Sequence, residues 1–196
     1  MSAVGTLPSP VGARVRTAWL VALLVSAVAL RSGIGPRTTP GGLAMAAVLL
    51  AGAVTSSRAD GTPPAARRRL AEPVLWGIGG AALLVCGPLL AWHPGPSPTG
   101  AFAPWAVAVT IVVVAEEAFL RGALWRACAR RTGGAGALVV TTAAFAGMHV
   151  PVYGWRAVPL DLVVGALLGG LRLGSGSVVA PTVAHLAADW AGWWLV

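Results

Sequence analysis

The chain of 196 residues contains no lysine and only six acidic residues, and charged side chains make up 10% of it. Hydrophobic residues account for 57%. A soluble domain carries about 25% charged residues, so this composition excludes a soluble domain. It predicts a polytopic membrane protein, because the chain is long enough for about six to eight spans.

Cysteine is also scarce. Cys86 and Cys128 do not have the spacing of a zinc site or of a disulfide framework, so we expect both to be packing residues. The net charge of +8 would suggest nucleic acid as the partner of a soluble protein. Here the arginines lie between apolar runs, which indicates membrane topology and anionic lipids instead, with no nucleic acid. No small-residue cleavage site follows the first apolar run, so no cleavable signal peptide is expected.

Apolar runs separated by Gly, Pro and Arg predict an all-α bundle of about seven transmembrane helices around a polar chamber. Residues 1–72 would form an N-terminal membrane region with two short spans and a basic loop, and residues 73–196 a core. One of the first two runs could instead lie at the interface. Gly133 and Gly134 should break the chain between the fourth and fifth spans, and Pro151 should end the fifth. The runs are 17–30, 41–54, 73–92, 102–131, 135–150, 160–173 and 177–196.

The arginines predict the orientation of these spans. Cytoplasmic loops of membrane proteins carry an excess of Lys and Arg. An N-terminus inside places eleven arginines in the cytoplasm and only three, Arg31, Arg37 and Arg156, outside. We therefore expect a multi-pass protein of a bacterial plasma membrane with a cytoplasmic N-terminus. The eleven are Arg14, Arg16, Arg58, Arg67, Arg68, Arg69, Arg121, Arg126, Arg130, Arg131 and Arg172.

Two adjacent carboxylates, Glu116 and Glu117, lie in the fourth run, and Arg121 follows them. A charge at the centre of a membrane helix costs at least ~2.5–3.5 kcal/mol, so such groups face the protein interior and are functional candidates. Glu117 and Arg121 are one turn apart, in the favourable order for an ion pair. Glu116 points about 100° away from Glu117 around the helix, so it is not part of this pair and is available for another function. An interfacial charge cluster at the end of a span is the competing interpretation.

Two further spans carry polar side chains at helical spacing. Phe145 and His149 are four residues apart in the fifth run, as are His185 and Asp189 in the last. Glu116 lies 17 residues before Gly133 and His149 lies 16 after it, which predicts similar depths in two antiparallel helices. These side chains could therefore converge on one chamber inside the membrane.

The segments EEAFLR, FAGMH and HLAAD, in this order on three spans, resemble the three motifs of the CPBP intramembrane protease family. This group contains the type II CAAX prenyl proteases and Abi-like proteins that process bacteriocins or give immunity to them. The resemblance covers about residues 75–196. It implies an intramembrane endopeptidase with a chamber open to the cytoplasm, acting on a membrane-associated protein or peptide. The implied roles are water activation by Glu116 and His149, oxyanion stabilisation by His185 and Asp189, and support from Glu117, Arg121 and Phe145.

Two points of the chemistry stay open. The family usually has Asn where this chain has Asp189, and an ionised Asp cannot donate a hydrogen bond. Asp189 must therefore be protonated, orient His185 or bind a metal. Glu116, His149 and His185 could also form a two-His, one-carboxylate site for Zn²⁺ or another divalent ion. The protease would then be a metalloprotease rather than a glutamate-type enzyme.

Two other functions compete with the protease. A non-catalytic family member could act as a membrane scaffold or a bacteriocin-immunity protein, which the intact set of Glu and His residues disfavours. An ion-coupled transporter could use Glu116 and Arg121 as a relay. It would be expected to show inverted repeats or broken helices in both halves, which the sequence lacks.

The orientation is testable by reporter fusions. A fusion after Ala65 should report the cytoplasm and a fusion after Ser97 the exterior, because one predicted span separates them. Activities of alkaline phosphatase and of a cytoplasmic fluorescent reporter at both sites provide the measurement. Fusions that report the same side would reject the seven-span arrangement.

Overall fold

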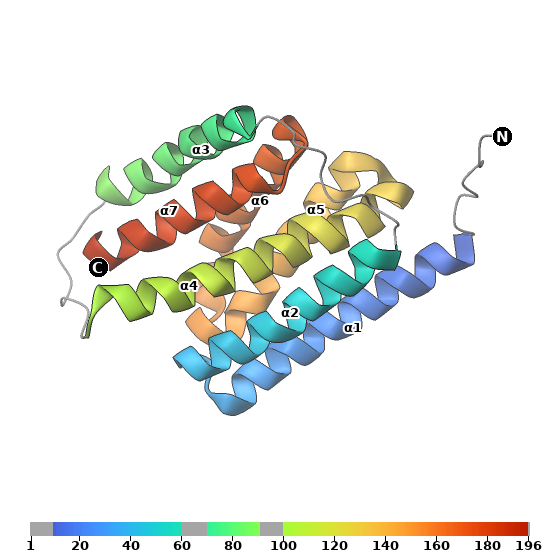
Figure 1. Cartoon of the computed structure of the whole chain (residues 1–196), viewed down its shortest axis with the longest axis horizontal. Helices are drawn as coiled ribbons and strands as arrows, with labels where there is room; N and C mark the ends of the chain where they lie inside the picture. Colours follow the sequence, from blue (N-terminus) through green and yellow to red (C-terminus); the bar gives the residue numbers. More distant parts are fainter. Residues whose placement is uncertain (1–9, 60–69, 91–99, 196) are drawn as a thin grey trace.

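A computed structural model describes residues 10–59, 70–90 and 100–195, and within these ranges every regular element is a helix (Figure 1). The predicted all-α class is therefore confirmed. The elements are α1 (Pro10–Ile34), α2 (Thr39–Ala59), α3 (Ala71–Leu90), α4 (Phe102–Glu117), the π-helix η1 (Ala118–Leu124), α5 (Trp125–Tyr153), the 3₁₀-helix η2 (Trp155–Ala157), α6 (Val158–Ser175) and α7 (Val179–Leu195).

One long rod organises the molecule. α4 continues without a break through η1 into α5, and the rod ends at Gly133, whose φ of 69° and ψ of −176° interrupt the helix. The predicted break at this glycine is confirmed. The predicted end at Pro151 is wrong, because α5 includes Pro151 and runs on to Tyr153, where Gly154 with φ 81° ends it.

Membrane-crossing capacity differs among the helices. In the described residues, four stretches are long and apolar enough to cross a bilayer: Val15–Ile34, Thr39–Ala59, Phe102–Tyr153 and Trp155–Ser175. The third contains the Gly133 break. The apolar part of α3, Ala71–Cys86, is shorter. Together with the family reported below, these helices make the chain a multi-pass membrane protein, while the count of seven spans stays a prediction.

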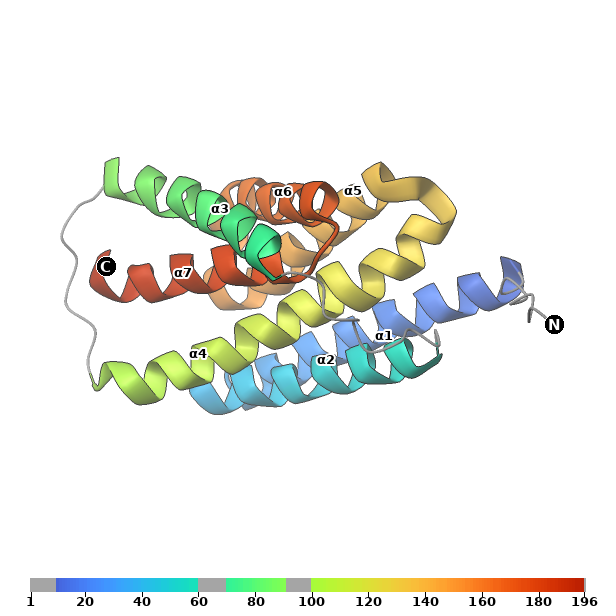
Figure 2. The ribbon, with the colours of Figure 1, turned by 45° about the horizontal axis from the view of Figure 1, so that its top comes forward.

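The rod lies between two layers of helices (Figure 2). α1 and α2 pack on one side of it, and α3, α6 and α7 form the other side. The predicted N-terminal region therefore packs directly on the core. A Cβ on Gly52 of α2 would meet the Phe119 ring of η1 at 3.0 Å, so the glycine permits this close contact.

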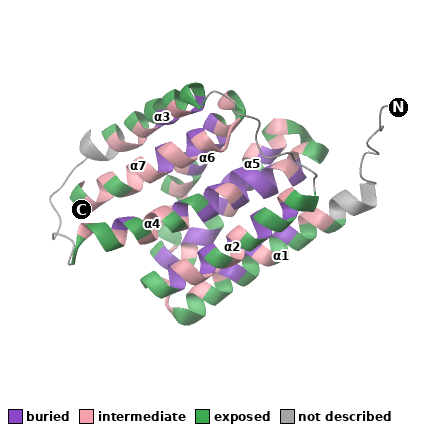
Figure 3. Cartoon of the chain, in the orientation of Figure 1, coloured by how far each residue is buried: buried purple, intermediate pink, exposed green. Residues whose placement is uncertain are grey.

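Burial is greatest in the middle of the rod, at η1 (Figure 3). Phe119, Leu120 and Leu124 of η1 are at most 1% exposed and form the centre of the apolar core. Large apolar side chains also cover the outer surface, among them Leu83 and Val163, each 67% exposed. An apolar outer surface of this kind suits lipid, since every backbone polar group is satisfied within the helices.

The glycines at GxxxG spacing in α6 bring it close to α5. A Cβ on Gly165 would meet the Thr142 Cα at 3.3 Å, and one on Gly169 would meet the Leu138 Cγ at 3.2 Å. Small residues at this spacing allow two backbones to approach, as the sequence predicted. The close approach also delivers the Gly165 carbonyl to the site described below.

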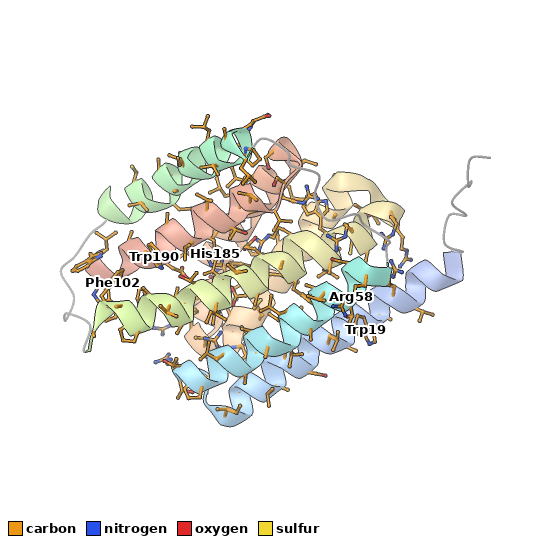
Figure 4. All side chains as sticks on the ribbon, in the orientation of Figure 1. Trp19, Arg58, Phe102, His185 and Trp190 are labelled. Carbon is orange, nitrogen blue, oxygen red and sulfur yellow. The ribbon has the colours of Figure 1, made fainter. Side chains whose placement is uncertain are left out.

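The two ends of the bundle differ in chemistry (Figure 4). Phe102 at the start of α4 packs with Trp190, Trp193 and Trp194 of α7, with ring centroids 5.5–6.3 Å apart. Arg58 at the end of α2 lies toward the opposite end. The end with Phe102 thus carries an aromatic cluster, while Arg58 and Trp19 lie toward the other end. Trp and Arg side chains near helix ends are typical of membrane interfaces.

Replacing Gly133 by Ala should destabilise the protein. The backbone at Gly133 lies in a region essentially restricted to glycine, and the cost of forcing another residue there is about 1–3 kcal/mol. A Cβ would meet no atom within 4 Å, so the cost comes from the backbone alone. Gly147→Ala is the matched control, because Gly147 lies within α5, also has open space and should gain up to about 1 kcal/mol. Thermal unfolding in detergent measures both, and equal stability of the two variants would contradict the assignment.

Candidate active site

A buried carboxylate, Glu117, connects three helical segments. Its Oε1 accepts a hydrogen bond from Arg121 Nη1 at 2.9 Å and another from His185 Nδ1 at 3.0 Å. The side chains of Glu117 and Arg121 are 0% exposed and that of His185 is 7% exposed. The predicted Glu117–Arg121 pair is therefore confirmed. The link to His185 was not foreseen.

Arg121 extends this network to α6 and α5. Its Nη2 donates to the Gly165 carbonyl at 3.2 Å, and its guanidinium lies 4.9 Å from the centre of the Phe145 ring. Arg172 Nε of α6 donates in turn to the Arg121 carbonyl at 2.9 Å. A buried guanidinium is tolerated only with such a set of partners. These contacts connect α4, η1, α5, α6 and α7 around the Arg121 side chain.

The π-helix η1 begins directly after Glu117. The spacing of Glu117 and Arg121 predicts an α-helix here, whereas residues 118–124 form the wider turn of a π-helix. Short π-segments within α-helices occur frequently at functional sites. Within this wider turn the Glu117–Arg121 contact is kept, and the Arg121 carbonyl receives Arg172. The backbone at Arg121 is therefore π-helical, a geometry that is less favourable than an α-helix, and it lies within the Glu117 network.

Phe145 and His149 form the α5 side of the site. His149 Nδ1 lies 2.9 Å from the Phe145 carbonyl, and because a carbonyl can only accept, Nδ1 carries the proton and donates. In the neutral ring Nε2 is then an acceptor. The Phe145 ring packs edge to face against both imidazole rings. The distance between ring centroids is 4.4 Å to His149 and 5.5 Å to His185. Phe145 thus touches both histidines and Arg121, which sets their spacing.

Glu116 is 2% exposed and lies beside this network without joining its hydrogen bonds. Its carboxyl group interacts electrostatically with His185, Asp189 and Arg31. Among the described residues, none forms a hydrogen bond or ion pair with it. The two adjacent glutamates therefore differ in their contacts, as their spacing predicted. Glu117 is bound on the network, and Glu116 faces the remaining polar groups.

Asp189 lies on the same face of α7 as His185, as the spacing predicted, but at the edge of the site. Its Oδ1 is 3.8 Å from His185 Nε2, which is an ion-pair distance beyond a direct hydrogen bond. The Asp189 side chain is 41% exposed, whereas that of His185 is 7% exposed. His185 thus has one carboxylate at each ring nitrogen, Glu117 in contact and Asp189 farther away.

Two neighbours of the site were not predicted from the sequence. The Tyr153 ring lies 5.6 Å from the His149 ring, and Arg31 of α1 is within electrostatic range of Glu116 and His149. Tyr153 follows His149 by four residues, and this helical spacing is the signal in the sequence that indicates the contact. Nothing in the sequence of α1 indicates that Arg31 approaches the site, because that depends on how α1 packs.

The predicted zinc ligands do not form a preformed site. Within the described part of the chain, no three His, Cys, Asp or Glu side chains are gathered closely enough to hold a metal ion. His185 Nδ1 is engaged by Glu117 and His149 Nδ1 by a carbonyl, which leaves one free nitrogen on each ring. A preformed three-ligand site is therefore absent from the described residues. The need for Zn²⁺ stays an untested prediction.

Residues 98–191 match the model of a protein family described as type II CAAX prenyl endopeptidase, Rce1-like. Over this segment, which is slightly less than half of the chain, the protein is similar to that family. The segment contains the Glu117 network together with Glu116, His149 and Asp189. At the level of the family, this match supports a membrane-embedded endopeptidase of the CAAX protease type, which is a hydrolase. Neither curated proteins nor solved structures gave a match.

Arg121→Ala should strongly lower the stability of this CAAX-type protein. Removing one partner of a buried pair leaves the other charge uncompensated, at a typical cost of about 3–5 kcal/mol. Arg131→Ala, which removes an exposed arginine, should change stability by no more than about 0.5 kcal/mol. Folded yield and thermal unfolding of the purified variants are the measurements.

A charge-neutral double variant, Glu117→Gln with Arg121→Met, should recover part of the lost yield. The recovery is partial because His185 also loses its charged acceptor. An Arg121→Ala variant that accumulates and melts like the parent would show that the pair has no structural role.

Proposed function

We propose that this protein is an intramembrane endopeptidase that hydrolyses a peptide bond of a membrane-associated protein or peptide with a water molecule activated by Glu116 and His149. One observation carries the proposal. The buried Arg121–Glu117–His185 network occupies one glutamate of the pair and fixes one histidine, while Glu116 and His149 Nε2 keep acceptor sites. Peptide hydrolysis requires this combination of a base and a fixed donor.

Water activation follows from the two acceptors. A water molecule has two protons, and a carboxylate oxygen of Glu116 and the Nε2 of His149 each accept one hydrogen bond. The lone pairs of the water oxygen are then directed away from both groups, toward the carbonyl carbon of a bound peptide. As the oxygen attacks, Glu116 takes one proton, and a C–O bond forms while the carbonyl becomes an oxyanion.

His185 is the proposed oxyanion donor. Its Nδ1 is bound to Glu117, so Nε2 can donate as well only when both ring nitrogens carry a proton. The carboxylates of Glu117 and Asp189 on the two sides of the ring suit such an imidazolium. Collapse of the tetrahedral intermediate then breaks the C–N bond. Glu116 returns its proton to the leaving nitrogen, so the products are a carboxylate terminus and an amine.

The remaining assignments concern support and location. Phe145 holds the spacing of both histidines, and Arg121 holds Glu117 in place. The arginine distribution supports a cytoplasmic N-terminus, and we assign the protein to a bacterial plasma membrane as part of the same proposal. A scaffold or immunity protein would have no use for two fixed histidines beside a buried acid. Phe119, Leu120 and Leu124 beside Arg121 are apolar and nearly unexposed, which disfavours an ion relay through η1.

Glu116→Gln should abolish cleavage with little effect on folding. The amide cannot take a proton from water, and loss of a general base typically lowers the rate about 10²- to 10⁴-fold. Glu72→Gln is the matched control, because Glu72 lies at the exposed start of α3. The measurement compares newly formed protein termini in membranes that contain the parent, Glu116→Gln or Glu72→Gln, and adds a farnesylated CAAX reporter peptide on the purified proteins. Identical termini in all three membranes would favour the non-catalytic alternative.

The same reporter assay separates two roles of Asp189. If the carboxylate maintains the charge of His185, Asp189→Asn should reduce the rate at every pH, and the 3.8 Å ion-pair distance favours this outcome. The alternative is that Asp189 must be protonated to donate a hydrogen bond to the oxyanion. The activity of the parent should then fall at alkaline pH, whereas Asp189→Asn should keep the rate and show no such fall. A rate and pH profile equal to those of the parent would leave Asp189 without a chemical role.

A further inference from the structure

A groove of about 480 Å³ lies at the surface between α2, η1 and the segment before α7. Its walls are formed by residues from all three segments, and none of the proposed catalytic residues lines it. We call it the basic groove and define it by Leu50, Val54, Ser57, Arg58, Gly122 and Arg126.

The wall of the basic groove is apolar along α2 and basic at the end of that helix. Leu50 and Val54 precede Ser57 and Arg58 by about two turns and one turn, and Val54 is 46% exposed. The groove therefore changes from apolar to basic along the axis of α2. That axis is roughly the axis of the bundle, with Arg58 toward the end away from Phe102 (Figures 2 and 4).

The arginine from the rod is held in a defined place. Arg126 Nη2 donates to the Ser57 hydroxyl at 3.0 Å, and that hydroxyl donates to the Ala53 carbonyl at 2.9 Å. Arg58 follows Ser57 and is exposed. Two guanidinium groups, one fixed across the groove and one at its rim, thus lie beside the same opening. A guanidinium presents several N–H donors in a planar fork that matches the oxygens of a phosphate.

We propose that the basic groove is a binding site for one anionic phospholipid, with its phosphate at Arg58 and Arg126 and an acyl chain along Leu50 and Val54. The charge complementarity and the apolar-to-basic order along the membrane axis argue for a lipid. A free phosphate would gain nothing from the apolar wall, whereas a zwitterionic lipid would place its own cation beside the arginines. The proposal does not depend on the protease activity.

Native mass spectrometry of the detergent-purified chain with equal amounts of phosphatidylglycerol and phosphatidylcholine tests the site. The parent should retain one phosphatidylglycerol in preference. The double variant Arg58→Gln/Arg126→Gln should bind it about 25-fold more weakly, at about five-fold per arginine near the membrane surface. Arg130→Gln/Arg131→Gln removes the same charge from exposed positions outside the groove and should bind it almost as the parent does.

Val54→Trp tests the apolar wall with an exposed substitution that leaves both arginines in place. It should fill the groove and lower phosphatidylglycerol binding, while circular dichroism and the elution volume stay those of the parent. Three results would each overturn the proposal. The two double variants could lose phosphatidylglycerol binding equally, Val54→Trp could bind it as the parent does, or the parent could show no preference between the two lipids. The proposal would also be overturned by displacement of the lipid by millimolar inorganic phosphate, which would make the site a phosphate site, or by the farnesylated peptide, which would make it a substrate site.

Discussion

The structure depends on one buried contact, the bifurcated hydrogen bond in which Glu117 Oε1 accepts from both Arg121 and His185. Each of these polar groups would be expensive to bury alone, at about several kcal/mol per uncompensated ion. Together they compensate one another's charge and fix the relative positions of the rod and α7. Glu116, which is also buried, stays outside these bonds, so the contact fixes one glutamate of the adjacent pair and not the other.

Small residues make this contact possible at the level of packing. Gly165 lets α6 approach α5 closely, and its carbonyl then accepts from Arg121. Gly52 similarly admits the Phe119 ring and brings α2 against η1. In a bilayer, where lipid is as apolar as a leucine side chain, such close backbone approach is a main source of helix association. The glycines and the polar network are therefore two parts of one arrangement.

The π-helix η1 has two faces with different surroundings. Arg121 points from it into the polar network, while Gly122 lines the basic groove together with Arg126 of the following turn. The backbone between them is shared, so a change on the groove side is only one residue away from the guanidinium that holds Glu117. This adjacency follows from the order of the chain, in which Arg121 and Gly122 are consecutive residues of η1.

The sequence determined the helical class, the Gly133 break, the Glu117–Arg121 pair and the grouping of His185 with Asp189, because each depends on composition or on spacing within one helix. The same local rules missed the π-geometry of η1 and misplaced the end of α5 at Pro151, since tertiary contacts outweigh such preferences. Only the tertiary structure decided that His185 binds Glu117 and that Arg31 approaches Glu116. These contacts join residues far apart in the chain, and the packing angles that bring them together are not encoded in any single helix.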